Sequence, residues 1–415
     1  MQNVECRMQN LGTRARGSVE RYSERRERGL DKHLKSSYDI VIIGGGIIGC
    51  AVAFELAKRG RKDALIIEQE YLTSGATGRC GAGIRQQWGS VLNATLAVES
   101  THIFENLEDY TDYGGSCGLN QGGYLLVAYT EKEWNQFQRN LEVQHSLGIN
   151  SFAVAVEDVR QIVPHISTDG MYGACFCGKD GHADPFHCTY AYAKGAQRMG
   201  VDIATYTTVT DLVVENDRIS TVQTNKGDVR ANTVINCAGG HAACVAALVR
   251  DELPIFPERH QILITEPVAH IMNPMVMSFS RRFYVQQTPH GSVIMGMGDP
   301  AEPVSLNIRP SWQYLEHNAW LVTQTLPAFR KLRVVRQWGG LYDMSPDRNP
   351  IINEAESAEG FYTIAGFSGH GFMIAPRTAI LVANHLTGQE DSIDITRFSA
   401  GRFKTGELLV EPSVV

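Results

Sequence analysis

An apolar segment that runs into glycines near the start of the chain constrains its fold more than any other feature. Residues 38–49 read YDIVIIGGGIIG, and a second apolar run ends at Glu68. A buried strand, a turn at Gly44 and Gly46, a helix that packs closely at Gly49 and a later acidic residue form a dinucleotide-binding βαβ unit. The helix N-terminus supplies N–H groups for the phosphates. The segment therefore predicts a parallel α/β sheet with a dinucleotide site, in which Glu68 accepts hydrogen bonds from a ribose.

Composition narrows the classes to which the chain can belong. A length of 415 residues suits two or three structural domains, and 43% hydrophobic residues suit an ordinary core. The net charge of -7 gives no electrostatic case for binding nucleic acid. Nine cysteines lie scattered without metal-ligand spacing, so we expect no metal site and a reduced, cytoplasmic protein. The longest apolar stretch, 40–54, is interrupted by glycines, and we expect no transmembrane segment.

Residues 1–37 differ from the rest of the chain. They are rich in Arg, Glu and Ser and poor in large apolar residues, so they cannot bury enough surface to fold alone. They contain no apolar region of a secretory signal, and their acidic residues argue against a transit peptide. We expect a flexible tail, with a partner-docking helix as the alternative.

The order of patterns predicts a discontinuous Rossmann-like domain interleaved with a second domain. The fold class is α/β plus antiparallel β. The nucleotide domain is expected over 38–118, 180–250 and 345–395, the antiparallel substrate domain over 119–179 and 251–344, and a C-terminal tail over 396–415. Helices are expected at 91–112, 131–147, 186–199, 310–326 and 376–386. Strands are expected at 124–129, 202–206, 209–215, 219–224, 228–230, 233–240, 261–265, 283–288, 292–297, 333–344 and 360–367.

A second glycine-rich junction lies near the other end of the chain, where residues 365–372 read AGFSGHGF. A flavin extends far beyond its pyrophosphate and needs a second anchor, whereas an NAD enzyme keeps its nucleotide half contiguous. Backbone N–H groups at such a junction stabilise negative charge on a reduced flavin. The junction favours FAD over NAD. The alternative is that Gly366, Gly369 and Gly371 only form a sharp turn.

Four segments together resemble one family. They are the unit 44–68, SGATGRCGAGIR at 74–85, TVINCAGG at 233–240, and WGGLYDMSPD at 338–347 paired with AGFSGHGF. Their order resembles the D-amino-acid oxidase superfamily of FAD enzymes, in its sarcosine oxidase-like branch. Within that branch RCGAGIRQQ, GHADPF and ERHQILITEP are most similar to the β subunit of dye-linked L-proline dehydrogenases. The resemblance covers nearly all of the chain after Ser37.

The resemblance implies an FAD-dependent dehydrogenase or oxidase acting on CH–NH bonds. It would oxidise a secondary amino acid, L-proline or a relative, to an imine by hydride transfer to flavin N5. The chain would be the catalytic β subunit of a hetero-oligomer whose α-type partner carries further redox centres, peripheral to an electron-transfer complex. Two alternatives stay open. One is an oxidase of sarcosine, glycine or an opine that uses oxygen directly, and the other is a non-catalytic flavin-binding subunit.

Three residues are candidates for the substrate side of the site. Arg85 follows a glycine-rich loop, and a guanidinium binds a carboxylate through two hydrogen bonds; a phosphate contact or a surface ion pair is its alternative. Tyr342 matches a substrate-side tyrosine of sarcosine oxidases, with a core tyrosine as its alternative. His260 lies in an alternating strand and would face the substrate side unless it is structural.

The remaining candidates are expected to contact the cofactor, with His370 organising the flavin-binding turn. They are Gly44, Gly46, Ile47, Ile48, Gly49, Glu68, Gln69, Ser74, Ala76, Thr77, Arg79, Cys80, Gly81, Val209, Ala238, Gly239, Gly366, Gly369, His370, Gly371, Phe372 and Met373.

Three positions depart from the family pattern. Met373 stands where sarcosine oxidases have a lysine that holds the carboxylate, which weakens a sarcosine assignment and places more weight on Arg85. Gly340 stands where monomeric sarcosine oxidases have the cysteine that carries the flavin, so the FAD is expected to be non-covalent. Pro185 stands where other β subunits tether FMN through a histidine, with His187 out of register. Any FMN would then be non-covalent, at a subunit interface.

Overall fold

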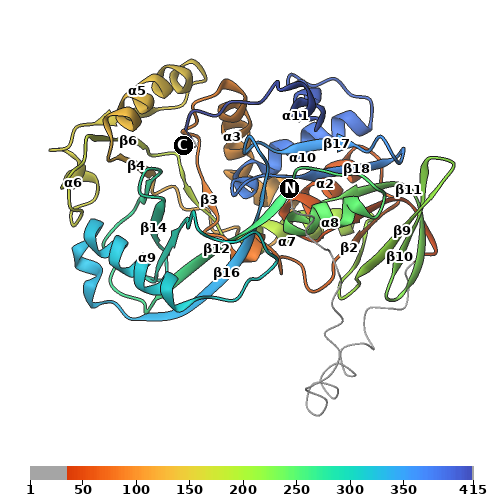
Figure 1. Ribbon diagram of the computed structural model, residues 1–415, viewed down its shortest axis with the longest axis horizontal. Coiled ribbons are helices and arrows are strands. Elements are labelled where there is room, and N and C mark those ends of the chain that lie inside the picture. Colours follow the sequence, from red (N-terminus) through yellow and green to blue (C-terminus); the bar gives the residue numbers. More distant parts are fainter. Residues whose placement is uncertain (1–34, 414–415) are drawn as a thin grey trace, which may run out of the picture.

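The computed structural model describes residues 35–413 and contains two large sheets (Figure 1). The sheet that contains the first glycine turn lies with its helices on the right of the view, and the second sheet lies on the left. This arrangement confirms the predicted fold class, an α/β nucleotide-binding sheet combined with an antiparallel sheet. The expectation for residues 1–34 lies outside the described part of the chain.

The first sheet is mainly parallel, with the strand order β17-β18-β11-β1-β2-β8 and the β9–β10 hairpin attached to β11. Only β17 on this path runs antiparallel to its neighbour. Its strands are β1 (Ser37–Ile43), β2 (Ala64–Ile67), β8 (Asp202–Ala204), β9 (Val209–Glu215), β10 (Arg218–Thr224), β11 (Gly227–Asn236), β17 (Ile351–Glu354) and β18 (Phe361–Ala365). The strand expected at 233–240 is part of β11, which pairs with β1.

Both faces of the first sheet are buried, which explains its unbroken apolar strands. Ile40 and Ile42 on β1 pack with helices α2, α7 and α10, while Val41 and Ile43 pack with the β9–β10 hairpin and α8. The helices are α2 (Ile47–Lys58), α7 (Pro185–Arg198), α8 (Ala242–Ala247) and α10 (Gly371–Leu386), with α3 (Val91–Phe104) and α4 (Leu107–Thr111) outside them. The N-termini of α2 and α10 therefore both lie against this sheet.

The second sheet has the strand order β16-β12-β15-β14-β13-β4-β6-β5, and only β13 and β4 pair in parallel. Its strands are β4 (Tyr124–Ala128), β5 (Ser151–Val154), β6 (Gly173–Cys177), β12 (Phe256–Thr265), β13 (Met275–Ser278), β14 (Phe283–Gln287), β15 (Val293–Met297) and β16 (Val334–Met344). Helices α6 (Val159–Ile162) and α9 (Trp312–Thr325) pack on one face and α5 (Glu131–Ser146) on the other. A two-stranded sheet, β3 (Gly83–Ile84) with β7 (Gly181–His182), lies apart from both.

Several expected elements have different limits. The helix expected over 91–112 is two helices, α3 and α4, and the strands expected at 228–230 and 233–240 form one strand, β11. Helix α10 begins at Gly371 and contains Pro376 in its second turn. Proline favours the first position of a helix, which is why the pattern placed the start too late. Strands β13 and β17 were not expected.

The segment assigned to a C-terminal tail packs against the protein as far as Ser413. It contains η4 (Ile395–Phe398) and α11 (Gly401–Thr405), and Arg402 forms an ion pair with Asp347 at 2.7 Å. Glu411 and Ser413 are buried beyond it. Phe398 joins the main hydrophobic core, whereas Glu411 and Ser413 are held by hydrogen bonds that no apolar pattern reveals. Within residues 35–413 no helix has both the length and the apolar character needed to cross a bilayer.

Candidate active site

The first glycine turn is closed against the end of β11. Gly44 has a φ of 114°, and a Cβ placed on it would lie 2.4 Å from the carbonyl oxygen of Cys237. A Cβ on Gly49 would lie 2.1 Å from the carbonyl oxygen of Gly44. Ala238 and Gly239 follow at the same place, which brings two predicted parts of the site together. A side chain is excluded from both positions of the turn because the obstacles are backbone atoms.

Glu68 is buried and oriented by the turn. Its Oε2 accepts a hydrogen bond from the Gly45 N–H at 2.8 Å, and its Oε1 accepts from the Glu70 N–H at 2.9 Å and the Ser74 hydroxyl at 3.1 Å. Thr77 accepts from the N–H of Ile47, the first residue of α2, at 3.2 Å. The acid is thus fixed beside the helix N-terminus, as a ribose-binding carboxylate requires.

The second glycine junction is organised by Asp343 on β16. The Asp343 Oδ2 accepts the Gly366 N–H at 2.7 Å, and its carbonyl accepts the Ser368 N–H at 2.9 Å. Burial raises the pKa of Asp343 to about 6, against the effect of these backbone donors. Gly366 and Gly369 have φ values of 80° and 93°, and α10 begins directly afterwards at Gly371.

Helices α2 and α10 both begin at the glycine junctions, and in their first turns only one N–H, that of Ile47 in α2, is bonded to a side chain among the described residues, the Thr77 hydroxyl. Neither N-cap residue makes a side-chain hydrogen bond to its helix, and neither helix has an acidic residue in its first turn. Free N–H groups and the positive end of a helix dipole suit phosphates and a reduced flavin. Gly44 also leaves no room for a Cβ. These features fit an FAD that extends from the first glycine turn toward the second glycine junction.

Arg85 is a buried cation without a carboxylate partner. Its side chain is 3% exposed, donates to the Gln87 carbonyl at 2.6 Å and lies over the Trp88 ring at 4.1 Å. Within residues 35–413 no carboxylate lies in ion-pair distance of the guanidinium. Burial lowers the pKa of Arg85, and the charges of Asp180 and Glu411 act in the opposite direction. A buried guanidinium with unused donors can bind an anionic group from outside the chain.

His370 lies beside this arginine. Its ring packs edge-on against Trp88 with centroids 4.9 Å apart, and its Nε2 has no hydrogen-bond partner among the described residues. Burial, together with the positive charge of Arg85, lowers the pKa of His370 to about 4, while Glu411 opposes the shift. The imidazole is therefore neutral at neutral pH, and one of its nitrogens remains available to a ligand.

The lowered pKa of His370 predicts a pH-dependent stability. Between a folded pKa of about 4 and an ordinary one near 6.5, only the unfolded state takes up the proton. The free energy of unfolding should therefore fall as pH decreases through this range, by about 3 kcal/mol from His370 alone. Urea unfolding at several pH values should show a smaller loss for His370→Gln than for the unchanged protein. Asp180 and Asp343 have raised pKa values and act oppositely in both proteins, so they cancel. Equal slopes would contradict the expectation.

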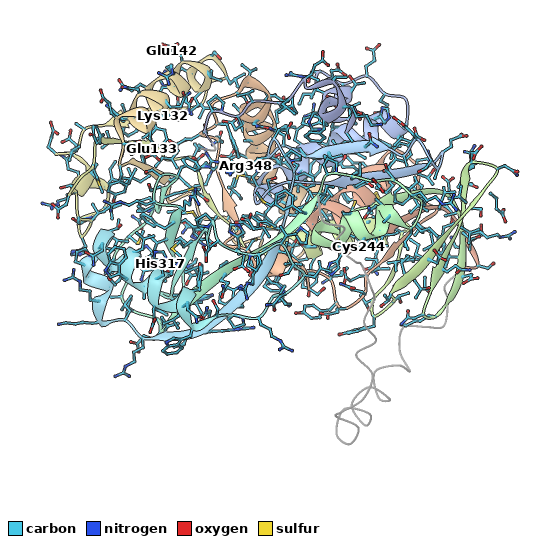
Figure 2. All side chains as sticks on the ribbon, in the orientation of Figure 1. Lys132, Glu133, Glu142, Cys244, His317 and Arg348 are labelled. Atoms are coloured by element: carbon cyan, nitrogen blue, oxygen red, sulfur yellow. The ribbon has the colours of Figure 1, made fainter. Side chains whose placement is uncertain are left out.

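Tyr342 and His260 form a stack on the second sheet. Their rings are 3.7 Å apart at the centroids with an interplanar angle of 14°, and a Cβ on Gly369 would touch the Tyr342 ring at 2.1 Å. The His260 Nε2 bonds Glu258 Oε1 at 2.8 Å, and this hydrogen bond lowers the pKa of Glu258. The stack thus lies against the second glycine junction. Arg348, which is labelled in Figure 2, is exposed, and its charge also lowers the pKa of Glu258.

Two tyrosines of the second sheet contact the glycine-rich loop before Arg85. A Cβ on Gly83 would lie 1.8 Å from the Tyr124 hydroxyl, and a Cβ on Gly81 would lie 3.1 Å from the Tyr284 ring. Tyr124 is buried and Tyr284 is partly buried, and desolvation raises the pKa of both well above the usual range. The charges of Arg85 and Tyr342 both act on Tyr124, so Tyr124 lies near both predicted residues.

The other predicted residues lie around the same loop or toward the Glu68 end. Arg79 donates to the Ser74 carbonyl at 2.9 Å and to the Gly339 carbonyl at 3.2 Å. Cys80 is within electrostatic range of Tyr342. Val209 opens β9 just after Thr207, whose N–H donates to the Glu68 carbonyl at 2.9 Å, and it lies away from Arg85.

Three further residues predicted to contact the cofactor differ in how exposed their side chains are. The Gln69 side chain is exposed, whereas Met373 is partly buried against the core. Phe372 packs on Phe104 with ring centroids 5.4 Å apart.

Three buried carboxylates are among the residues near the site that were missed from the sequence. Asp180 accepts the Gln86 N–H at 2.8 Å and the Gln87 amide at 3.0 Å, and burial raises its pKa to about 6. Asp343 and Glu411 are the others. The only signal for Asp343 was its place in the WGGLYDMSPD segment. Asp180 and Glu411 act through contacts with distant parts of the chain, which leave no local pattern.

A pocket of about 530 Å³ lies behind the glycine-rich loop. It is bounded by that loop, by the N-terminus of α7 at Pro185, and by the second sheet. Its charged or titratable lining residues are Tyr71, Arg79, Cys80, His182, Asp184, His290 and Arg336. The Asp184 carboxylate caps α7 by accepting the N–H groups of Phe186 and His187.

Comparisons with known proteins agree with this geometry. A family described as FAD dependent oxidoreductase matches residues 39–385. The chain is 27% identical over 382 residues to sarcosine oxidase subunit beta of Rhodobacter capsulatus, covering 91% of both chains. It is 29% identical over 383 residues to the same subunit of Arthrobacter sp., covering 91% of this chain and 94% of that one. L-proline dehydrogenase from P. horikoshii superposes with a TM-score of 0.85 and 35% identity, covering 91% of this chain and 100% of that one.

Proposed function

Because the chain belongs to the DAO family of FAD-dependent oxidoreductases, we propose that it oxidises a secondary amino acid, L-proline or a close relative. FAD-dependent oxidation of amino acids is the activity of the family branch to which its relatives belong. The finer assignment is supported by the 35% identity to an L-proline dehydrogenase over its whole length.

One observation carries the proposal, and it is the buried, unpaired guanidinium of Arg85. A cation held at 3% exposure is costly unless an anion joins it. A substrate carboxylate supplies that anion, and the planar fork of arginine fits it through two hydrogen bonds. Met373 provides no competing cation at the position where sarcosine oxidases have a lysine, so the carboxylate is expected at Arg85.

The remaining residues hold the amine end of the substrate and exclude water. Tyr124, Tyr284 and the Tyr342–His260 stack form aromatic walls beside the glycine-rich loop. The pKa of Glu258 is lowered, so this carboxylate is ionised and accepts a hydrogen bond from the His260 Nε2–H, which leaves Nδ1 as the acceptor. In that tautomer, His260 can take a proton from a substrate ammonium. Bound FAD would supply the two-electron acceptor for the C–H bond beside the nitrogen.

Anaerobic addition of L-proline tests the proposal directly. The purified protein should contain non-covalent FAD that can be released. The flavin absorbance at about 450 nm should bleach when L-proline is added. When an artificial dye acceptor is also present, the dye should be reduced. The bleaching should require the carboxylate, so pyrrolidine serves as the matched control. Absence of bleaching with a panel of secondary amino acids would remove this function. Rapid peroxide formation from oxygen would instead support the direct oxidase.

We extend the proposal to a second flavin and a partner chain. The pocket at Pro185 has four cationic or imidazole side chains, Arg79, His182, His290 and Arg336, which suit the phosphate of FMN. The similarity to subunits named beta supports an α-type partner that carries further redox centres, at the periphery of an electron-transfer complex. Native co-purification followed by release of both flavins checks this. FAD without FMN, on a chain purified without a partner, would contradict it.

A further inference from the structure

The C-terminal strap, which we define as residues 407–413, links the two sheets at the site. It runs from α11 back toward α3 (Figure 1). The Leu409 N–H donates to Asp347 at 3.1 Å, and the Leu409 carbonyl accepts from Asn349 at 3.0 Å. Further along, the Ser413 hydroxyl accepts from Asn140 on α5 at 3.0 Å. The strap is therefore fixed both to the segment 347–349 and to helix α5.

Glu411 is the most strongly held residue of the strap. Its Oε1 accepts the N–H groups of Gly89 at 2.8 Å and Ser413 at 2.9 Å. Its Oε2 accepts the Ser90 N–H at 3.2 Å, the Ser90 hydroxyl at 2.6 Å and the Asn93 amide at 3.0 Å. Burial alone would raise the pKa of Glu411, but these donors lower it. The side chain is thus a buried carboxylate at the N-terminus of α3.

The donors from Gly89 and Ser90 belong to the loop that carries Arg85. This loop, residues 85–90, is held at its other end by Asp180, which accepts from Gln86 and Gln87. In between, Gln144 on α5 donates to the Trp88 carbonyl at 3.0 Å. Trp88 in turn packs on the Arg85 guanidinium and donates to the Arg85 carbonyl at 3.0 Å. The position of the guanidinium therefore depends on both anchors.

Glu411 acts on Arg85 through its charge and makes no hydrogen bond to the guanidinium. It favours the charged form of Arg85 and also acts on His370. None of the five hydrogen bonds to Glu411 comes from Arg85. The Glu411 oxygens are therefore occupied and do not compete with a substrate carboxylate for the guanidinium. A distant, fully hydrogen-bonded carboxylate can balance a buried cation while leaving the cation's donors to a ligand.

We propose that Glu411 is a positioning residue for the substrate carboxylate, acting on Arg85 through the 85–90 loop. The inference rests on the proposed role of Arg85. A change at Glu411 should weaken only the binding of ligands that have a carboxylate, because only these ligands need the guanidinium in place. A ligand that has the amine but lacks the carboxylate should not sense the change.

Glu411→Gln tests this, since the amide keeps the shape but turns an NH₂ group toward N–H donors. We expect L-proline to bind about tenfold more weakly, measured by flavin absorbance and as KM, with pyrrolidine binding unchanged. Glu411→Asp, which keeps the charge, should recover part of the affinity. Glu407→Gln, at an exposed position of the same strap, is the matched control and should behave as the unchanged protein.

The outcomes separate this inference from the proposed function. Equal weakening of L-proline and pyrrolidine, with lost flavin and a lower Tm, would show a structural role only and overturn the inference. Loss of carboxylate selectivity in Arg85→Gln but not in Glu411→Gln would overturn it as well, while the function stands. If Glu411→Gln fails to fold, Ser90→Ala removes one donor to Glu411 together with the N-cap of α3 and leaves the carboxylate in place. It should weaken the binding of L-proline by about twofold to threefold and leave that of pyrrolidine unchanged. No selectivity in Ser90→Ala would then overturn the inference.

Discussion

Arg85→Gln should lower kcat/KM for the amino acid by about a thousandfold while FAD stays bound. Removing one partner of a buried, hydrogen-bonded charge pair costs about 4 kcal/mol, which corresponds to that factor. Arg85 donates to the Gln87 carbonyl and packs on Trp88, but no described residue of the FAD turn depends on it. Steady-state kinetics with a dye acceptor, alongside the flavin-to-protein absorbance ratio, measures both effects.

Two comparisons make the Arg85 result specific. Arg330→Gln removes an exposed arginine far from the loop and should leave kcat/KM unchanged. Arg85→Lys keeps the charge but loses the planar fork, so its activity should fall between those of Arg85→Gln and the unchanged protein. If Arg85→Gln retained full activity, the carboxylate would be bound elsewhere and the proposed site would be wrong.

Gly44→Ala should yield a protein with at least about tenfold less bound FAD and a clearly lower Tm. The added Cβ would lie 2.4 Å from the Cys237 carbonyl oxygen, and a φ of 114° is unfavourable for alanine. The left-handed region costs about 1–2 kcal/mol by itself, and the contact adds to it because the backbone of β11 cannot move aside. Flavin absorbance and thermal unfolding of the purified variant report the two losses.

Gly60→Ala is the matched control for backbone strain. Gly60 also has a positive φ, 92°, but a Cβ there would meet nothing within 4 Å. We expect Gly60→Ala to lower the free energy of unfolding by about 1 kcal/mol and to leave the amount of bound FAD unchanged. If both variants kept their FAD equally, the close approach of the turn to β11 would not matter for binding.

The parts of the fold that could be predicted from sequence are those with local periodic patterns. The strand and turn before α2 were clear because both faces of β1 are buried, which gives an unbroken apolar run. Strand β17 was missed because it is short and polar at its end, and the break between α3 and α4 was missed because the apolar pattern continues through it. Merging of two expected strands into β11 reflects pairing with both β1 and β10, which no local window contains.

The candidate site divides in the same way. Gly44 and Glu68 belong to a compact motif, and Arg85 lies next to a run of small residues, so all three could be predicted as site residues. The partners Tyr124 and Tyr284 could not, because they come from strands of the other sheet and meet Gly81 and Gly83 only in the folded protein. The glycines of that loop are explained by those rings as much as by a cofactor.

The closure of the first turn by β11 also imposes an order on biosynthesis. When a ribosome has made β1, α2 and β2, the strand that closes Gly44 does not yet exist, since Cys237 follows much later in the chain. The second junction comes later still, after β18 has paired with β11. Contacts so distant in sequence form slowly, and the exposed edge of β1 is prone to aggregation meanwhile. FAD should therefore bind only when synthesis of the chain is nearly complete. A shortage of flavin should lower the yield of folded protein and leave the rate of translation largely unchanged.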